Sequence, residues 1–129
     1  MAIEEKNQNF KFVAKTALDN NAAGTGVIYK AVDDGTGDIA ATGVTATGIL
    51  QSCARSGGHV TEAYQGFSKY TAGAAITSLN QWLTVTTSGY FIASTSGTWV
   101  VGKNKIGTVT SGSVGTGEFN FTIPQLDIV

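Results

Sequence analysis

Short stretches of alternating polar and apolar residues, separated by turn residues, run along most of this 129-residue chain. The clearest lies at 118–123, where two phenylalanines and an isoleucine alternate with polar residues. Successive side chains of a β-strand point to opposite faces, so this spacing predicts a half-buried strand. The same pattern predicts a first strand at 10–15, with Phe10 and Phe12 on one face.

Further extended segments follow from similar but weaker patterns. They are expected at 26–32, 39–51 (bent by two glycines), 59–66, 97–101 and 105–110, with three short pieces between 67 and 94. The acidic, glycine-containing run Asp33–Asp38 predicts a hairpin turn. The glycine-rich stretch 111–117 predicts a flexible connection, and the only proline, Pro124, is expected to end the last strand.

Nearly every candidate helical window contains glycine or clustered β-branched residues, so no useful amphipathic helix is expected. The predicted fold class is all-β, as a small antiparallel β-barrel or β-sandwich. Residues 1–9 are polar and predict a flexible N-terminal arm, while 10–129 predict a single β domain.

Charge and composition narrow the classes of partner. The formal net charge is −1, with eight Lys and Arg residues, nine Asp and Glu residues and no basic run. Neither nucleic acid nor a membrane is therefore expected as a partner. No run of about 18 apolar residues and no signal-peptide core occur, which predicts a soluble protein made in the cytoplasm. A single cysteine, Cys53, excludes an internal disulfide.

Two motifs in the 33–40 region resemble ligand-binding sequences but lack the required context. Residues 35–40 fit the dinucleotide pattern G-x-G-x-x-A, yet the sequence that follows is a poor helix former. Asp34, Thr36 and Asp38 alternate like cation ligands, but the glycine and glutamate of a calcium loop are missing. An ordinary hairpin turn is the favoured interpretation, and no metal or cofactor is expected.

Candidate catalytic pairs are equally incomplete. Cys53 and His59 lie six residues apart and suggest a thiolate with a nearby base, but one pair does not define a site. Glu62 and Glu118 would suit glycoside hydrolysis only if the fold brought them together. The sequence therefore predicts a protein that is not an enzyme.

The aromatic residues leave one binding function open. Five of them are candidates for a sugar-binding platform, although aromatic residues of so small a domain usually fill the core or an interface: Tyr64, Tyr70, Trp82, Tyr90 and Trp99. A carbohydrate- or receptor-binding module is accordingly the alternative function.

The order of several short segments resembles that of a known family. These are Thr47–Gln51 (TGILQ), His59–Gly66, Ala72–Thr77 (AGAAIT), the WLTV strand at 82–85, Gly89–Ala93 (GYFIA) and Val101–Lys103 (VGK). Together they resemble the small capsid decoration, or cement, proteins of tailed bacteriophages over residues 26–123, although the terminal region is longer and richer in small residues than expected for them.

The resemblance implies a structural, non-catalytic role on the virion, and it would place the alternative, a carbohydrate- or receptor-binding module, on a virion fibre. Such proteins bind the outside of the capsid, bridge subunits of the major capsid protein and stabilise the head. They typically do so as homotrimers at threefold or quasi-threefold positions. The expected partners are thus the major capsid protein and further copies of this chain, and the expected location is the capsid exterior after synthesis in the bacterial host's cytoplasm.

The capsid-binding residues are predicted to lie in the arm and at its junction with the body. The candidates are Ile3, Glu4, Glu5, Lys6, Phe10 and Phe12. In this hypothesis the polar arm becomes ordered on the capsid while the two phenylalanines anchor it to the β domain.

Overall fold

The computed structural model describes residues 7–16, 18, 28–122 and 125–126. These residues form strands and one short 3-10 turn, η1 (Thr87–Gly89). The strands are β1 (Asn7–Val13), β2 (Ala31–Asp33), β3 (Asp38–Ile39), β4 (Gly48–Leu50), β5 (His59–Thr71), β6 (Trp82–Val85), β7 (Phe91–Ala93), β8 (Trp99–Asn104), β9 (Val114–Asn120) and β10 (Gln125–Leu126). The predicted all-β fold is confirmed.

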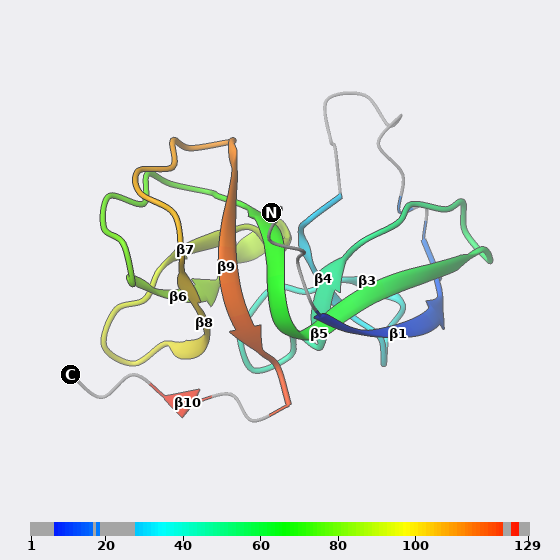
Figure 1. Ribbon diagram of the computed structural model, residues 1–129. Helices are drawn as coiled ribbons and strands as arrows, with labels where there is room; N and C mark the ends of the chain where they lie inside the picture. Colours follow the sequence, from blue (N-terminus) through cyan, green and yellow to red (C-terminus); the bar gives the residue numbers. More distant parts are fainter. Residues whose placement is uncertain (1–6, 17, 19–27, 123–124, 127–129) are drawn as a thin grey trace.

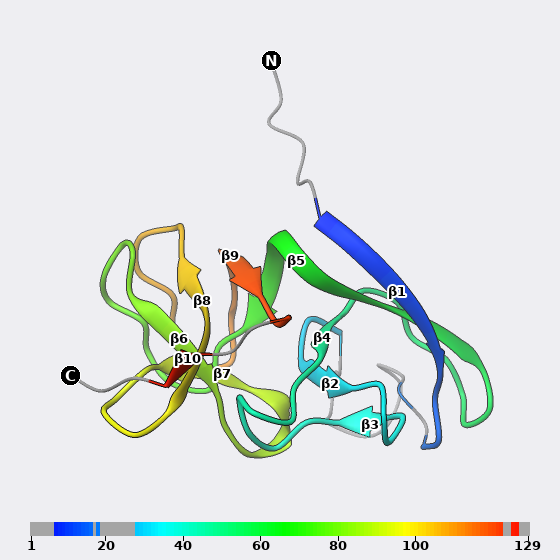
Figure 2. The same cartoon turned by 90° about the horizontal axis from the view of Figure 1, so that it is seen from below.

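The strands belong to one antiparallel sheet that curls into a half-barrel (Figures 1 and 2). Its order is β3-β2-β4-β5-β9-β8-β6-β7, with β1 paired to β5 and β10 paired to β8. The long strand β5 connects two halves of the sheet, one made of β1 to β4 and the other of β6 to β10. Its first part pairs with β1 and β4, and its second part pairs with β9. Gly66, with φ of 105°, lies where the pairing changes and adopts a conformation that glycine accepts without strain.

Two apolar clusters form the core. The larger contains Tyr70, Phe91 and Phe119, whose ring centroids lie 5.3 to 5.8 Å apart in edge-to-face arrangements. These rings come from β5, β7 and β9, so they join strands that are distant in sequence. The second cluster packs β1 against β2, β4 and β5, and its buried residues are Phe12, Ala14, Leu18, Val32, Leu50 and Val60.

Several predicted elements are confirmed. The first strand is β1, and the Asp33–Asp38 turn joins β2 to β3, with Val32 opposite Ile39. The alternation near the C-terminus also holds, since Phe119 and Phe121 are buried while Glu118 is exposed. Pro124 lies outside the described residues.

The predicted strand at 26–32 is wrong over most of its described part. Residues 28–30 form a turn in which Tyr29 has φ of 63°, and β2 begins only at Ala31. The Tyr29 amide donates to the Leu50 carbonyl, while its own carbonyl accepts from the Thr71 amide, each at 2.9 Å. These partners are remote in sequence, so tertiary contacts override the local strand preference.

The strand predicted at 39–51 is two short strands with a turn between them. β3 ends at Ile39 and β4 begins at Gly48. Within the turn, the Thr45 amide donates to the Thr42 hydroxyl at 3.2 Å. Such side-chain to backbone bonds compete with strand pairing, which explains the interruption.

The strand predicted at 105–110 is mostly irregular, and the flexible connection predicted at 111–117 contains the start of a strand. Within 105–110 only an isolated bridge from Val109 to Ile76 is present among the described residues, whereas β9 begins at Val114, inside the predicted flexible connection. A Cβ on Gly115 would lie 2.8 Å from the Tyr70 ring. Glycine therefore serves close packing here and not chain flexibility.

The structure shortens the predicted arm. Residues 7–9 already pair with β5 as the start of β1, with Asn7 opposite Gly66 and Asn9 opposite Ala63. Ile3, Glu4, Glu5 and Lys6 lie outside the described residues.

Gly102 provides a test of how closely β8 approaches β9. A Cβ at this position would lie 2.7 Å from the Glu118 carbonyl oxygen and would also overlap the Phe119 ring. We expect Gly102→Ala to lower the free energy of unfolding by about 2 kcal/mol in urea denaturation, because the packed core resists overpacking. Gly107→Ala is the control, since nothing lies within 4 Å of its Cβ position. Equal effects of the two substitutions would contradict this account.

Candidate functional site

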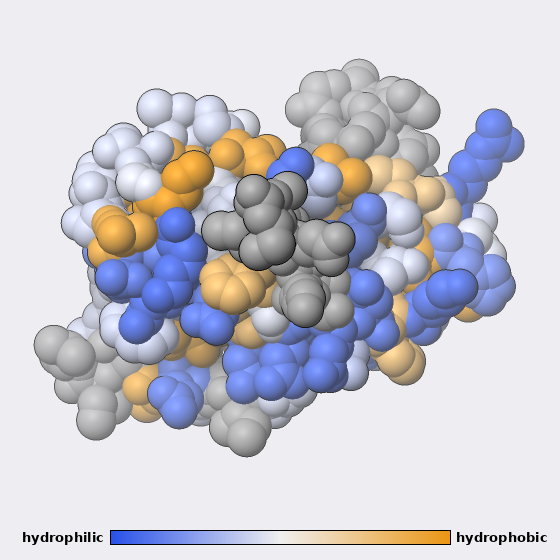
Figure 3. All heavy atoms as spheres, viewed as in Figure 1, coloured by the Kyte–Doolittle hydropathy of each residue, from blue (hydrophilic) through white to orange (hydrophobic). Residues whose placement is uncertain are grey.

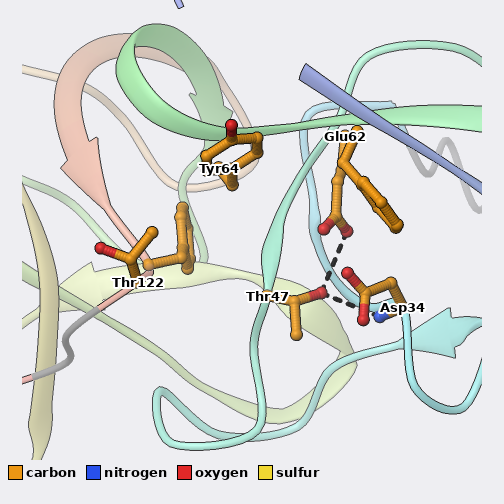
Figure 4. Close-up of a pocket in the computed structure, with 7 residues that line it drawn as sticks. Asp34, Thr47, Glu62, Tyr64 and Thr122 are labelled. Carbon is orange, nitrogen blue, oxygen red and sulfur yellow. Dashed lines mark hydrogen bonds between the residues drawn. The ribbon is translucent and has the colours of Figure 1, made fainter. Parts of the chain in front are cut away.

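A cavity of about 320 Å³ opens beside β1 (Figure 4). Its lining combines aromatic, hydroxyl and carboxyl groups from five segments of the chain: Phe10, Asp34, Thr47, Glu62, Tyr64, Phe121 and Thr122. The cavity contains one residue of the predicted capsid-binding set, Phe10. It therefore lies next to the point at which the predicted arm meets the β domain.

Glu62 places a carboxyl group in the interior of the protein, and only 1% of the residue's surface is exposed. The strand alternation of β5 places it on the same side as buried Val60, opposite Phe10 of β1. Gly48 of β4 makes room for it, since a Cβ there would lie 2.9 Å from the Glu62 Cγ and Cδ atoms. The close approach of β4 to β5 thus requires glycine at this position.

A small polar network surrounds the Glu62 carboxyl group. The Thr47 hydroxyl donates to Glu62 Oε2 at 3.0 Å and accepts from the Asp34 amide at 2.8 Å. The Asp34 side chain lies close enough to the Glu62 carboxyl group to act on its pKa. Figure 4 shows the Glu62 carboxyl group and the Asp34 side chain lying next to each other beside the Thr47 hydroxyl.

Burial is the main reason why the pKa of Glu62 rises to about 9. The hydrogen bond to Asp34 and the negative charges of Asp34 and Asp33 raise the pKa further, while the bond from Thr47 opposes the shift. At pH 7 Glu62 is therefore a neutral acid.

The edge of β1 that faces away from β5 is exposed, and it lies next to this cavity. Among the described residues β1 forms its ladder with β5 alone, and Phe10 and Val13 are 51% and 48% exposed. Phe12 is buried in the second apolar cluster. Phe10 instead borders the cavity and presents half of its surface to solvent, so it is available to a partner.

Of the candidate catalytic pairs of the sequence, only Glu62 lines this cavity. Cys53 and His59 are both exposed, and neither lines the cavity. Glu62 faces the cavity, whereas Glu118 is exposed on β9 and lines a different groove. Within the described part of the chain no three His, Cys, Asp or Glu side chains gather as metal ligands.

The five aromatic residues proposed as a sugar-binding platform do not lie on one exposed surface. Tyr70 is fully buried, and the Tyr64 hydroxyl donates to Gln8 at 2.9 Å in the wall of the cavity. Of the five, only Trp82 is exposed, with 49% of its surface accessible to solvent. It borders a second groove, of about 440 Å³, that crosses β5, β9, β8 and β6. The hypothesis of a binding platform formed by all five aromatic residues is therefore wrong.

The pair formed by Asp34 and Glu62 was missed by sequence reasoning. The two residues are 28 positions apart, and no local motif connects them. One signal was present: Glu62 shares a strand face with Val60 and Tyr64. A carboxyl group at an inward position of a strand indicates either a partner or a raised pKa.

Exposed apolar side chains are spread over the molecule. Figure 3 shows that, on the face it presents, they gather in several small patches separated by polar groups. No described helix has the length and apolar character of a membrane span. No protein-family model matches the chain, and no curated protein matches it either.

Proposed function

We propose that this protein is a capsid decoration protein that binds the outer surface of a tailed-phage head and stabilises contacts between major capsid protein subunits. The observation that carries the proposal is the exposed edge of β1, where Phe10 and Val13 face solvent directly after the predicted arm. An edge strand offers backbone donors and acceptors to an added strand, and its apolar side chains add contact area.

The remaining surface supports a binding role spread over many copies. Apolar patches that are small and separated favour weak contacts, and a capsid presents the same site many times. The low net charge of −1 also gives no electrostatic preference for nucleic acid. The protein is proposed to act without catalysis, on the capsid exterior, after synthesis in the host cytoplasm.

A homotrimer is part of the same proposal. Placement at a threefold or quasi-threefold position lets each of three chains contact a different capsid subunit. Sedimentation equilibrium should then give three times the chain mass of 13.3 kDa for the unbound protein. A monomer at all concentrations would contradict the trimer but not capsid binding.

Cosedimentation with purified heads of a phage that encodes this chain tests the binding surface. Deletion of residues 2–6 and the substitution Phe10→Ala should each reduce capsid occupancy. Truncation of a central aromatic contact costs about 2 kcal/mol per site, or roughly thirtyfold in affinity. The deletion leaves β1 complete, because that strand begins at Asn7.

Leu79→Ala is the matched control for Phe10→Ala, because Leu79 is 59% exposed and lies outside β1. It should leave occupancy unchanged. If wild-type protein does not sediment with heads, the proposed function is wrong. If both the deletion and Phe10→Ala bind like wild type, capsid binding does not use the β1 edge.

A further inference from the structure

Four residues, three of them exposed and Lys103 half-buried, form a cross-strand row on one face of the half-barrel. Phe67 of β5 stands opposite Glu118 of β9, which stands opposite Lys103 of β8, which stands opposite Trp82 of β6. Four separate strands supply this row, so its spacing is fixed by the sheet and not by a loop. Side chains carried by strands keep their relative positions better than side chains on loops, as a binding surface requires.

Trp82 is held in place within the row. The Lys103 ammonium lies 4.2 Å from the centroid of the Trp82 ring, a distance at which a cation is attracted to the ring face. Half of the Trp82 surface nevertheless stays open, at 49% exposure. An indole that is both fixed and accessible is suited to stack against a ligand at little cost in side-chain entropy.

Hydrogen-bonding groups converge on the same groove. Its volume of about 440 Å³ lies within the range of small-ligand sites. Three residues with amide side chains are among those that line it: Gln65, Asn120 and Gln125. The Asn120 Oδ1 atom accepts from the Thr122 amide at 3.0 Å, so Asn120 contributes mainly its NH2 donors. The Glu118 carboxylate and the Lys103 ammonium complete the lining. Amides offer both donors and acceptors, whereas a carboxylate adds acceptors alone.

An aromatic face beside several amides and a carboxylate matches the surface of a sugar. The ring of a hexose has an apolar face of C–H groups, which carry partial positive charge and pack on the negative face of an indole. Its rim carries hydroxyls that donate and accept at the same time, as amides do. We propose that the groove beside Trp82 binds a neutral oligosaccharide. This site is separate from the proposed capsid contact at β1.

Single-stranded nucleic acid also stacks on aromatic side chains, but it requires a basic groove. Among the described residues that line the groove, Lys103 is the single cation; it stands opposite Glu118, and the chain has a net charge of −1. The phosphate backbone would therefore find no compensating charge. A neutral sugar has no such requirement.

Isothermal titration calorimetry with maltohexaose, cellohexaose and chitohexaose tests the proposal on the full chain. We expect saturable binding of at least one of these sugars with a dissociation constant between micromolar and millimolar. Trp82→Ala should weaken that binding at least about tenfold, and Trp82→Phe should weaken it less because an aromatic face remains. Asn120→Ala should weaken it without removing the stacking surface.

Phe10→Ala and Leu79→Ala are the controls and should bind sugar as wild type does, since neither residue lines the groove. If Trp82→Ala does not fold, as judged by circular dichroism, Trp82→Phe and Asn120→Ala decide the matter. No saturable binding of any of the three sugars would overturn the proposal, as would wild-type affinity in Trp82→Phe and Asn120→Ala together. Binding of a single-stranded oligonucleotide in place of sugars would overturn it as well. Capsid cosedimentation is measured independently, so failure of one proposal leaves the other standing.

Discussion

Glu62→Gln is expected to increase the free energy of unfolding by about 3 kcal/mol at pH 7. Glu62 is 1% exposed, and its pKa rises from 4.5 to about 9 on folding, mainly through burial. At pH 7 the unfolded chain releases this proton while the folded chain keeps it, which favours the unfolded state. Glutamine is neutral in both states and retains both donor and acceptor for Asp34 and Thr47.

The sign of the pH dependence follows from proton binding. Between pH 4.5 and about 9 the folded state binds more protons at Glu62 than the unfolded state does. Stability therefore falls as pH rises through this window, by about 1.4 kcal/mol per pH unit at most. Below the unfolded pKa both states are protonated, so Glu62 then contributes no penalty. Urea denaturation from pH 4 to 9 measures the slope.

The matched control is Glu118→Gln, which makes the same chemical change at an exposed position. Its free energy of unfolding should stay within about 0.5 kcal/mol of wild type across the range. In Glu62→Gln the stability curve should be flatter than in wild type. Parallel curves for wild type and Glu62→Gln would mean that Glu62 is ionised in the folded protein.

Asn104→Ala is expected to lower the free energy of unfolding by about 4 kcal/mol. The side chain of Asn104 is fully buried, and its Oδ1 accepts from the Tyr70 hydroxyl at 2.8 Å. Its amide nitrogen lies within 3.1 Å of three backbone carbonyl oxygens, those of Ser78, Ile106 and Gly107. Alanine would leave the buried Tyr70 hydroxyl without this acceptor and would remove the donor that connects the carbonyl groups of two loops.

Asn104→Asp separates the two halves of this network. Aspartate retains the acceptor for Tyr70 but has no donor for the carbonyls, so it should be at least as destabilising as alanine. Asn120→Ala is the control: its Oδ1 atom accepts only from the amide and hydroxyl of exposed Thr122, so the substitution should change stability by about 1 kcal/mol or less. Thermal unfolding followed by circular dichroism gives all three values. Similar melting temperatures for Asn104→Ala and Asn120→Ala would contradict the role of this network.

Local patterns predicted some elements well because their causes are local. Phe119 and Phe121 alternate with polar residues and lie on the buried face of the sheet, as their spacing indicated. The hairpin between β2 and β3 likewise depends on consecutive turn residues. The turn at Tyr29 could not be predicted, since its hydrogen-bond partners are Leu50 and Thr71. Such partners are known only once the strands are paired.

For the candidate sites the sequence contributed residues and the fold contributed their neighbours. Phe10 was singled out by its strand pattern, but its place beside Glu62 and Asp34 follows from the pairing of β1 with β5. Trp82 was one aromatic residue among five until the pairing of β6 with β8 set it against Lys103.

The sequence by itself determined that this protein is all-β, because alternation and turn chemistry depend on adjacent residues. It also determined the low charge that disfavours nucleic acid. Only the tertiary structure decided the half-barrel, the raised pKa of Glu62 and the row from Phe67 to Trp82. The physical reason is that burial and cross-strand register depend on residues far apart in the chain, whose meeting no local pattern encodes.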